Sequence, residues 1–217
     1  VERSFEQLKD DFGYQKLGGN FVSVGASYDY AGLGCTHHCP ADVAILKNIP
    51  NMEIVVPGTS SEFDTLFRQS YANGHPTYYR LSEKENTEGQ AVTFGKANVI
   101  RKGKKATVVA IGPTLSTVIE ACKDEDVTIL YYTTVAPFDA KTLRNNCSSG
   151  KVLLVEPYYE GGLSSEISTA QRPLPVLIET VGVPHRFLEN YCKMDEYNTQ
   201  LGFTAKSIRE HLNILIS

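Results

Sequence analysis

The stretch Gly32-Leu33-Gly34-Cys35-Thr36-His37-His38-Cys39-Pro40 brings small residues, two imidazoles and two thiols together within nine positions. The apolar run Phe21–Val24 before it predicts a buried strand. After it, Pro40 suits a first helical position, and the Asp42 carboxylate favours the positive end of a helix dipole. The stretch is therefore predicted to be a loop at the carboxyl end of a strand, which is where open α/β sheets bind ligands.

Three interpretations of this loop compete. Cys35, His37, His38 and Cys39 could bind zinc, but all four lie within five residues and no second pair of ligands is evident, so we expect no metal site. A second interpretation is an ordinary turn whose histidines are satisfied by hydrogen bonds. We prefer a catalytic loop that faces a substrate, because imidazoles exchange protons near neutral pH.

Bulk composition excludes several classes of protein. The 217 residues are 41% hydrophobic and 21% charged, with a net charge of -4 and no basic run, so nucleic acid is not an expected partner. No apolar run approaches the roughly 20 residues that cross a bilayer, and we expect no membrane partner. No signal peptide opens the chain, and its five cysteines are an odd number. We therefore expect reduced thiols and a cytoplasmic location.

The first residues have a helical pattern. Val1, Phe5, Leu8 and Phe12 recur at helical spacing, and Gly13 could end the helix. Because the first residue is Val1 and not methionine, we interpret the chain as a fragment of something longer or as a processed product.

Strand and helix patterns then alternate, which predicts parallel sheets. In the first half, strands are expected over Glu53–Pro57 and Pro76–Leu81, with a helix between them that begins at the capping-box pattern Thr59-x-x-Glu62. The polar segment Ser82–Gln90 has no aliphatic core residue and is predicted to be a linker.

The second half is expected to begin with strands over Ala91–Arg101 and Lys105–Ile111. It continues as a further α/β series and ends in a helix over Ala205–Ile216. We therefore predict two consecutive α/β domains with largely parallel sheets, over residues 1–86 and 87–217.

The histidine-containing loop, with Leu46-x-x-Ile49-Pro50-Asn51-Met52 and Val55-Val56-Pro57 after it, resembles the pyrimidine-binding domain of transketolase-like thiamine diphosphate enzymes. That family includes transketolase, 1-deoxyxylulose-5-phosphate synthase and the β subunits of 2-oxoacid dehydrogenases. The second half resembles the C-terminal domain of the same family in its segments 110–114, 133–139, 155–157, 161–163, 182–184 and 201–204. The resemblance implies a partial thiamine diphosphate-binding fold followed by a transketolase C-terminal-like domain.

The resemblance also assigns roles to residues. It places His37 at the family histidine that faces the substrate and stabilises a developing alkoxide, so His37 is the predicted catalytic residue. His38, Arg80 and Ser27 are the predicted substrate-binding residues. Glu156, at the end of a buried strand, is expected to be structural or to lie at an interface.

Two positions depart from the family pattern. Transketolases and deoxyxylulose-phosphate synthases have an acidic residue four positions before the histidine, where this chain has Leu33. They also have an arginine that grips the acceptor phosphate, at a place that matches Glu83 here, and a glutamate would repel phosphate. The substrate is therefore expected to differ from the usual sugar phosphates.

The resemblance implies thiamine diphosphate and Mg²⁺ in the complete enzyme, but the family's catalytic glutamate and cofactor-stacking aromatic residue would lie upstream of Val1. The diphosphate- and magnesium-binding motif, Gly-Asp-Gly followed by Asn, is absent. We therefore expect a missing N-terminal domain or a separate partner polypeptide, a homodimer or heterotetramer, and no activity of this fragment alone.

The predicted reaction is transfer of a two-carbon ketol unit between small molecules of carbohydrate metabolism. The alternatives are a 2-oxoacid dehydrogenase β-type subunit, a 1-deoxyxylulose-5-phosphate synthase-like enzyme, and a non-catalytic paralogue that serves dimerisation or regulation.

Overall fold

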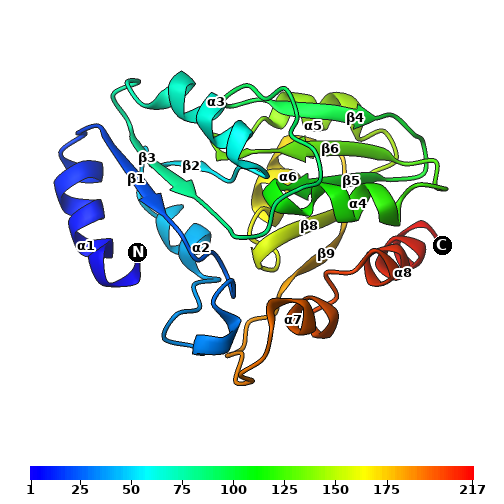
Figure 1. The fold of residues 1–217 in the computed structure, drawn as a ribbon. Coiled ribbons are helices and arrows are strands. Elements are labelled where there is room, and N and C mark those ends of the chain that lie inside the picture. Colours follow the sequence, from blue (N-terminus) through cyan, green and yellow to red (C-terminus); the bar gives the residue numbers. More distant parts are fainter.

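The computed structural model describes residues 1–217 and contains a four-stranded and a five-stranded sheet (Figure 1). The first sheet has the strand order β1-β3-β2-β7, in which β1, β3 and β2 are parallel and β7 is antiparallel to β2. Its strands are β1 (Gly19–Ser23), β2 (Glu53–Val55), β3 (Pro76–Arg80) and β7 (Thr134–Ala136). Every residue of the central strand β3 is buried, whereas β1 forms an edge.

Helical segments surround this sheet. They are η1 (Glu2–Ser4), α1 (Phe5–Gln7), η2 (Leu8–Tyr14), η3 (Ala31–Leu33), α2 (Asp42–Leu46) and α3 (Ser60–Ser70). The first three run on without a break, so the helix predicted at the start of the chain is present, with π-helical turns in its second half. Thr59 is the N-cap of α3 and accepts a hydrogen bond from the Glu62 amide at 3.2 Å, as the capping pattern predicts.

The second sheet has the order β4-β6-β5-β8-β9, and only β4 runs antiparallel to its neighbour. Its strands are β4 (Ala97–Arg101), β5 (Thr107–Ile111), β6 (Thr128–Tyr132), β8 (Lys151–Tyr159) and β9 (Leu177–Val183). The helical segments of this half are η4 (Gly112–Thr114), α4 (Leu115–Ala121), α5 (Ala140–Asn146), α6 (Ser164–Gln171), α7 (Met194–Gln200) and α8 (Ala205–Ile216).

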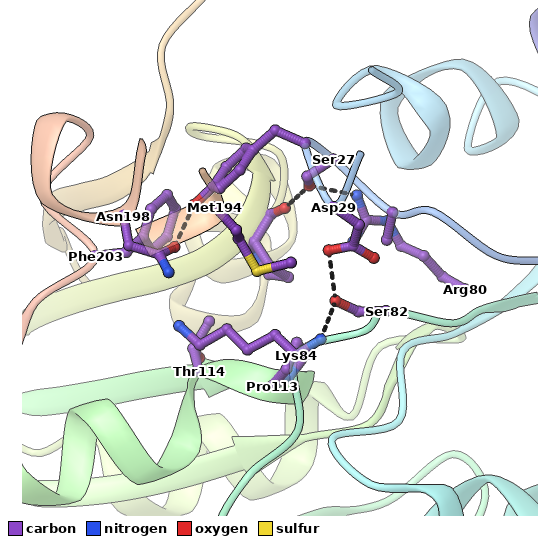
Figure 2. Close-up of a pocket in the computed structure, with 13 residues that line it drawn as sticks. Ser27, Asp29, Arg80, Ser82, Lys84, Pro113, Thr114, Met194, Asn198 and Phe203 are labelled. Atoms are coloured by element: carbon purple, nitrogen blue, oxygen red, sulfur yellow. Dashed lines mark hydrogen bonds between the residues drawn. The ribbon is translucent and has the colours of Figure 1, made fainter. Parts of the chain in front are cut away.

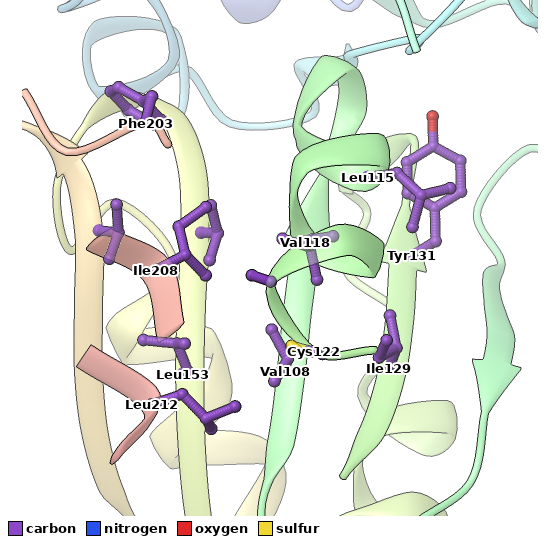
Figure 3. Packing of buried hydrophobic residues seen from close by; sticks show 14 of the residues in the cluster. Val108, Leu115, Val118, Cys122, Ile129, Tyr131, Leu153, Phe203, Ile208 and Leu212 are labelled. Carbon is purple, nitrogen blue, oxygen red and sulfur yellow. The ribbon is translucent and has the colours of Figure 1, made fainter. Parts of the chain in front are cut away.

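Alternate residues of the second sheet face two different helical layers, because successive side chains of a strand point to opposite faces. Val108 and Ala110 of β5 belong to the core that contains α4 and α8, whereas Val109 and Ile111 belong to the core that contains α5 and α6. The buried residues of α4 and α8 shown in Figure 3 include Leu115, Val118, Ile208 and Leu212. The sheet is therefore covered on both faces, as parallel sheets are.

Glu62 ties α3 to the connecting segment and to the second sheet. Its carboxylate accepts hydrogen bonds from the amides of Gly58 and Gln90 at 2.7 and 2.8 Å and from the hydroxyl of Tyr131 in β6 at 2.7 Å. A Cβ on Gly58 would lie 2.2 Å from the Tyr131 hydroxyl oxygen, so only glycine permits this approach. The two halves are therefore joined by buried polar contacts as well as by the chain.

The structure confirms two α/β units with mostly parallel sheets. Two features differ from the expectations. Strand β7 lies beyond the predicted linker yet completes the first sheet, and only Ala97–Arg101 of the expected strand over Ala91–Arg101 forms. The domain boundary between residues 86 and 87 stays a prediction. None of the helices combines the length and apolar character that a membrane span requires.

Candidate active site

The histidine loop, residues 24–41, connects β1 to α2 at the carboxyl end of β1. Its base is closed by a hydrogen bond of 2.7 Å from the Cys39 amide to the Ser27 carbonyl. Its tip is turned by Gly34, which has a φ of +77°, and the His37 amide donates to the Gly34 carbonyl at 3.0 Å. Ser27 has a φ of +55°, a conformation that costs a non-glycine residue about 1–3 kcal/mol unless its surroundings fix it.

A buried polar cluster, which we call the Asp42 cluster, supplies those surroundings. The Asp42 carboxylate accepts hydrogen bonds from Arg80 Nε and from the Tyr78 hydroxyl, both at 2.8 Å. Arg80 Nη2 donates to Ser27 Oγ at 2.7 Å, and Ser27 Oγ donates to the carbonyl of Pro157 in β8. The guanidinium also lies 5.5 Å from the centre of the Tyr158 ring. The base of the loop is thus fixed from beneath.

Two of the predicted substrate-binding residues belong to this cluster. Ser27 is 5% exposed and Arg80 only 1%, and the polar atoms described above contact other groups of the chain. Arg80 is buried because it ends the central strand β3, which is enclosed along its whole length. Contact of Ser27 or Arg80 with a substrate stays a prediction.

His37, the predicted catalytic residue, lies on the surface of the loop with an exposed imidazole. Its Nδ1 lies 3.1 Å from the hydroxyl oxygen of Thr36, and its ring meets that of Tyr30 edge to face, with 6.4 Å between ring centres. If the Thr36 hydroxyl donates to Nδ1, the ring proton is on Nε2, which then becomes a donor directed away from the loop.

His38 has a different environment. Both of its ring nitrogens are buried without a hydrogen-bond partner, and its ring packs edge to face against Tyr197 of α7 at 5.9 Å. Burial lowers the pKa of His38, so the neutral imidazole is favoured. The two adjacent histidines therefore differ, because His37 is open to solvent and His38 is turned towards the second half.

The loop cysteines do not join the histidines in a metal centre. Cys35 is exposed and Cys39 is half-buried, where burial raises the pKa of its thiol to about 11. No group of three or more His, Cys, Asp or Glu side chains is placed to hold a metal ion.

The two positions that depart from the family pattern are both open to solvent. Leu33 is 55% exposed beside the histidines. Glu83 is exposed at the start of the connecting segment, and its amide donates to the Asp29 carboxylate at 2.9 Å. An apolar and an acidic group are therefore available where the resemblance would place an acid and a cation.

A cavity of about 350 Å³ lies between the histidine loop, the connecting segment and the second half (Figure 2). Ser27 and Arg80 line it, whereas His37 and His38 do not. Sequence analysis missed its other polar lining residues, which include Asp29, Ser82, Lys84, Thr114 and Asn198. Ser82 and Lys84 fall in the segment predicted to be a linker, and the polar sequence of α7 has no apolar periodicity that would have revealed the helix carrying Asn198.

The second half also covers the tip of the histidine loop. A Cβ on Gly34 would lie 2.7 Å from the ring of Tyr191, so the aromatic side chain packs directly on the glycine. A neighbouring groove is lined by Gly34, Cys35, Phe187, Leu188, Glu189 and Tyr191. The sequence contained no motif that connected these distant segments.

Both halves of the chain match known protein families. Residues 1–88 match the family model for the transketolase pyrimidine binding domain, and residues 95–208 match that for the transketolase C-terminal domain. An uncharacterized 33.6 kDa protein in the fasciation locus of Rhodococcoides fascians is 33% identical over 98% of this chain and 70% of its own length.

Relatives with stated activities are more distant. One of the two apulose-4-phosphate transketolase polypeptides of Phocaeicola vulgatus, named as a subunit of that enzyme, is 28% identical over 85% of this chain and 63% of its own length. The 1-deoxy-D-xylulose-5-phosphate synthase of Thermus thermophilus is 28% identical over 98% of this chain, which spans only 35% of that enzyme.

Solved structures show the same fold. A split-gene transketolase, described as an inactive beta4 tetramer, has a TM-score of 0.87 and 22% identity over 99% of this chain and 72% of its own. A transketolase from Campylobacter jejuni has a TM-score of 0.71 and 17% identity over 90% of this chain and 31% of its own.

Proposed function

This chain belongs to the transketolase family, and we propose that it supplies the histidine loop to the active site of a transketolase-like transferase that moves a two-carbon ketol unit. The observation that carries the proposal is the contrast within the loop. Its base is fixed by the Asp42 cluster, whereas the His37 imidazole is exposed at the carboxyl end of β1. A rigid base with a free imidazole suits a residue that acts on a bound substrate.

His37 would act through Nε2. With the Thr36 hydroxyl donating to Nδ1, the Nε2–H group can donate a hydrogen bond to an alkoxide as it forms and can take part in proton transfer. We propose that His38, which packs on Tyr197 behind it, orients the loop and contacts the substrate less directly.

The residues of this chain do not form a site for Mg²⁺ and a diphosphate, since no three potential ligands lie together. We therefore derive no step through thiamine diphosphate and propose that a preceding segment or a second polypeptide holds it. Relatives described as a transketolase subunit and as a split-gene transketolase support a separate partner polypeptide, in a homodimer or a heterotetramer.

The exposed Leu33 and Glu83 favour a second candidate. A 2-oxoacid dehydrogenase β-type subunit has no need for an acid that binds a donor hydroxyl or for a cation that binds an acceptor phosphate. A 1-deoxyxylulose-5-phosphate synthase-like activity and a non-catalytic role in dimerisation or regulation are the remaining alternatives.

The test mixes the chain with a polypeptide that carries the Gly-Asp-Gly…Asn motif, thiamine diphosphate and Mg²⁺, and offers a ketose donor or a 2-oxoacid. We expect ketol transfer that falls about a hundredfold or more in His37→Ala and is unchanged in His75→Ala, which alters an exposed histidine outside the loop. Turnover of the 2-oxoacid alone would select the dehydrogenase alternative. An assembled complex that is inactive with both donors, or equal activity of His37→Ala and wild type, would refute the proposal.

A further inference from the structure

We propose that the cavity between the histidine loop, the connecting segment and α7 binds a small anion that bears a carboxylate or phosphate group, with the Lys84 ammonium as its counter-ion. The proposal does not depend on the transferase function, because His37 lies outside this cavity.

Lys84 is half-buried, and no hydrogen bond or ion pair joins its ammonium group to another residue of the chain. Figure 2 shows its side chain extended beneath Met194, with the amino end towards Thr114. Phe203 and Pro113 add apolar surface to the same cavity. Burial lowers the pKa of Lys84, as expected for a cation without a counter-ion. Buried charges are normally paired, so a ligand anion would complete the site.

Arg80 lines the same cavity but is not available in this way. Its Nε is bound to Asp42 and its Nη2 to Ser27, and both partners are buried with it. Lys84 is therefore the cation of the cavity that can accept a new partner.

The acidic groups near Lys84 leave its amino end open. Asp29 accepts hydrogen bonds from the Ser82 hydroxyl and the Glu83 amide, both at 2.9 Å. In Figure 2 it lies beside Ser82, at the backbone end of Lys84. Asp195 is exposed on α7 and is not among the lining residues.

Asn198 offers a second donor. Its Oδ1 accepts the Tyr28 hydroxyl at 2.8 Å, which fixes the amide, and its Nδ2 makes only a long bond of 3.4 Å to Asp195. The empty volume of about 350 Å³ is at the lower end of the roughly 300–1,000 Å³ range of small-molecule sites. The cavity therefore suits one compact anionic group.

The first experiment measures the melting temperature of the full chain in inorganic phosphate, in acetate and in chloride at matched ionic strength. A ligand that binds only the native state raises the melting temperature in proportion to its affinity. We expect a saturable rise with phosphate or acetate beyond that with chloride. The tighter of the two identifies the phosphate or the carboxylate group.

Variants then locate the site. Lys84→Met should weaken binding at least tenfold, Lys84→Arg should retain it within about threefold, and Lys206→Met, which alters an exposed lysine of α8, should match wild type. Asn198→Asp keeps an acceptor for Tyr28 but brings a carboxylate to the amino end of Lys84, so it should abolish the anion-dependent rise while the protein stays folded. An equal rise in chloride, or an undiminished rise in Lys84→Met or Asn198→Asp, would overturn the proposal.

Discussion

Asp42→Ala should be among the most destabilising single substitutions in this protein. The Asp42 carboxylate accepts hydrogen bonds from Arg80 Nε, the Tyr78 hydroxyl and the Val43 amide, at 2.8, 2.8 and 2.9 Å. Both side chains of the Arg80–Asp42 ion pair are only 1% exposed. Removal of the acid leaves a buried guanidinium without a counter-ion, which costs about 3–5 kcal/mol of unfolding free energy. For a chain of this size, that loss lowers the melting temperature by about 6–20 °C.

The matched control is Asp64→Ala, which breaks another Arg–Asp pair on the surface. Arg68 Nε lies 3.0 Å from Asp64 Oδ2, but the two side chains are 75% and 61% exposed. Pairs of this kind contribute about 0.3–0.5 kcal/mol. Both variants should be compared with wild type by urea unfolding at pH 7, followed by circular dichroism. The expected difference between them comes from burial, since the geometry of the two pairs is nearly the same.

The double variant Asp42→Ala/Arg80→Met separates the unpaired charge from the loss of packing. When both charges are removed, no buried ion remains, and apolar replacement of a buried pair is often neutral. The double variant should therefore be at least about 1 kcal/mol more stable than Asp42→Ala alone. A loss of less than about 1 kcal/mol in Asp42→Ala, or additive losses in the double variant, would show that the Asp42 cluster does not hold the loop as argued.

Three further predictions concern single residues. His37→Ala should keep the melting temperature of wild type within about 2 °C, since exposed substitutions change stability by about 0.5 kcal/mol, while His38→Ala should lower it because His38 packs on Tyr197; the reverse order would contradict both environments. Burial raises the pKa of Glu156 to about 8, above its ordinary 4.5, so the native state binds the extra proton and the unfolding free energy of wild type should fall between about pH 5 and pH 8. Glu156→Gln should flatten this decline in urea titrations across that range, and a parallel decline would refute it. Gly58→Ala should destabilise by more than about 1 kcal/mol in the same assay, because its Cβ would meet the Tyr131 hydroxyl at 2.2 Å, and no loss would mean that the contact yields easily.

Local patterns predicted the regular elements well. β5 has the expected bounds of Thr107–Ile111, and α8 those of Ala205–Ile216. Both have strong apolar patterns, and Thr204 caps α8 by accepting from the Ser207 amide. The elements that were missed have weak patterns. α7 consists mostly of polar residues, and β7 has three residues that pair with a strand some 80 positions earlier.

The candidate site was predictable only in part. The spacing of Gly34, Thr36 and His37 indicated a loop with an exposed imidazole, and the structure has one. The burial of Arg80 could not be inferred, because it depends on Asp42 from a separate element and on enclosure of β3 by the second half. Lys84 was missed for the same reason, since residues distant in sequence from it form much of its cavity.

The contacts of β8 explain why a catalytic loop of the first half needs the second half. The Pro157 carbonyl accepts from Ser27 Oγ near one end of the histidine loop, and the Tyr159 amide donates to the Pro40 carbonyl at the other end, at 3.1 Å. These two residues lie on one strand, so the spacing of the loop ends is set by the rigid geometry of β8. Tyr191 packs on Gly34 at the tip. The second half therefore fixes both ends and the turn of the loop, while the His37 imidazole remains exposed.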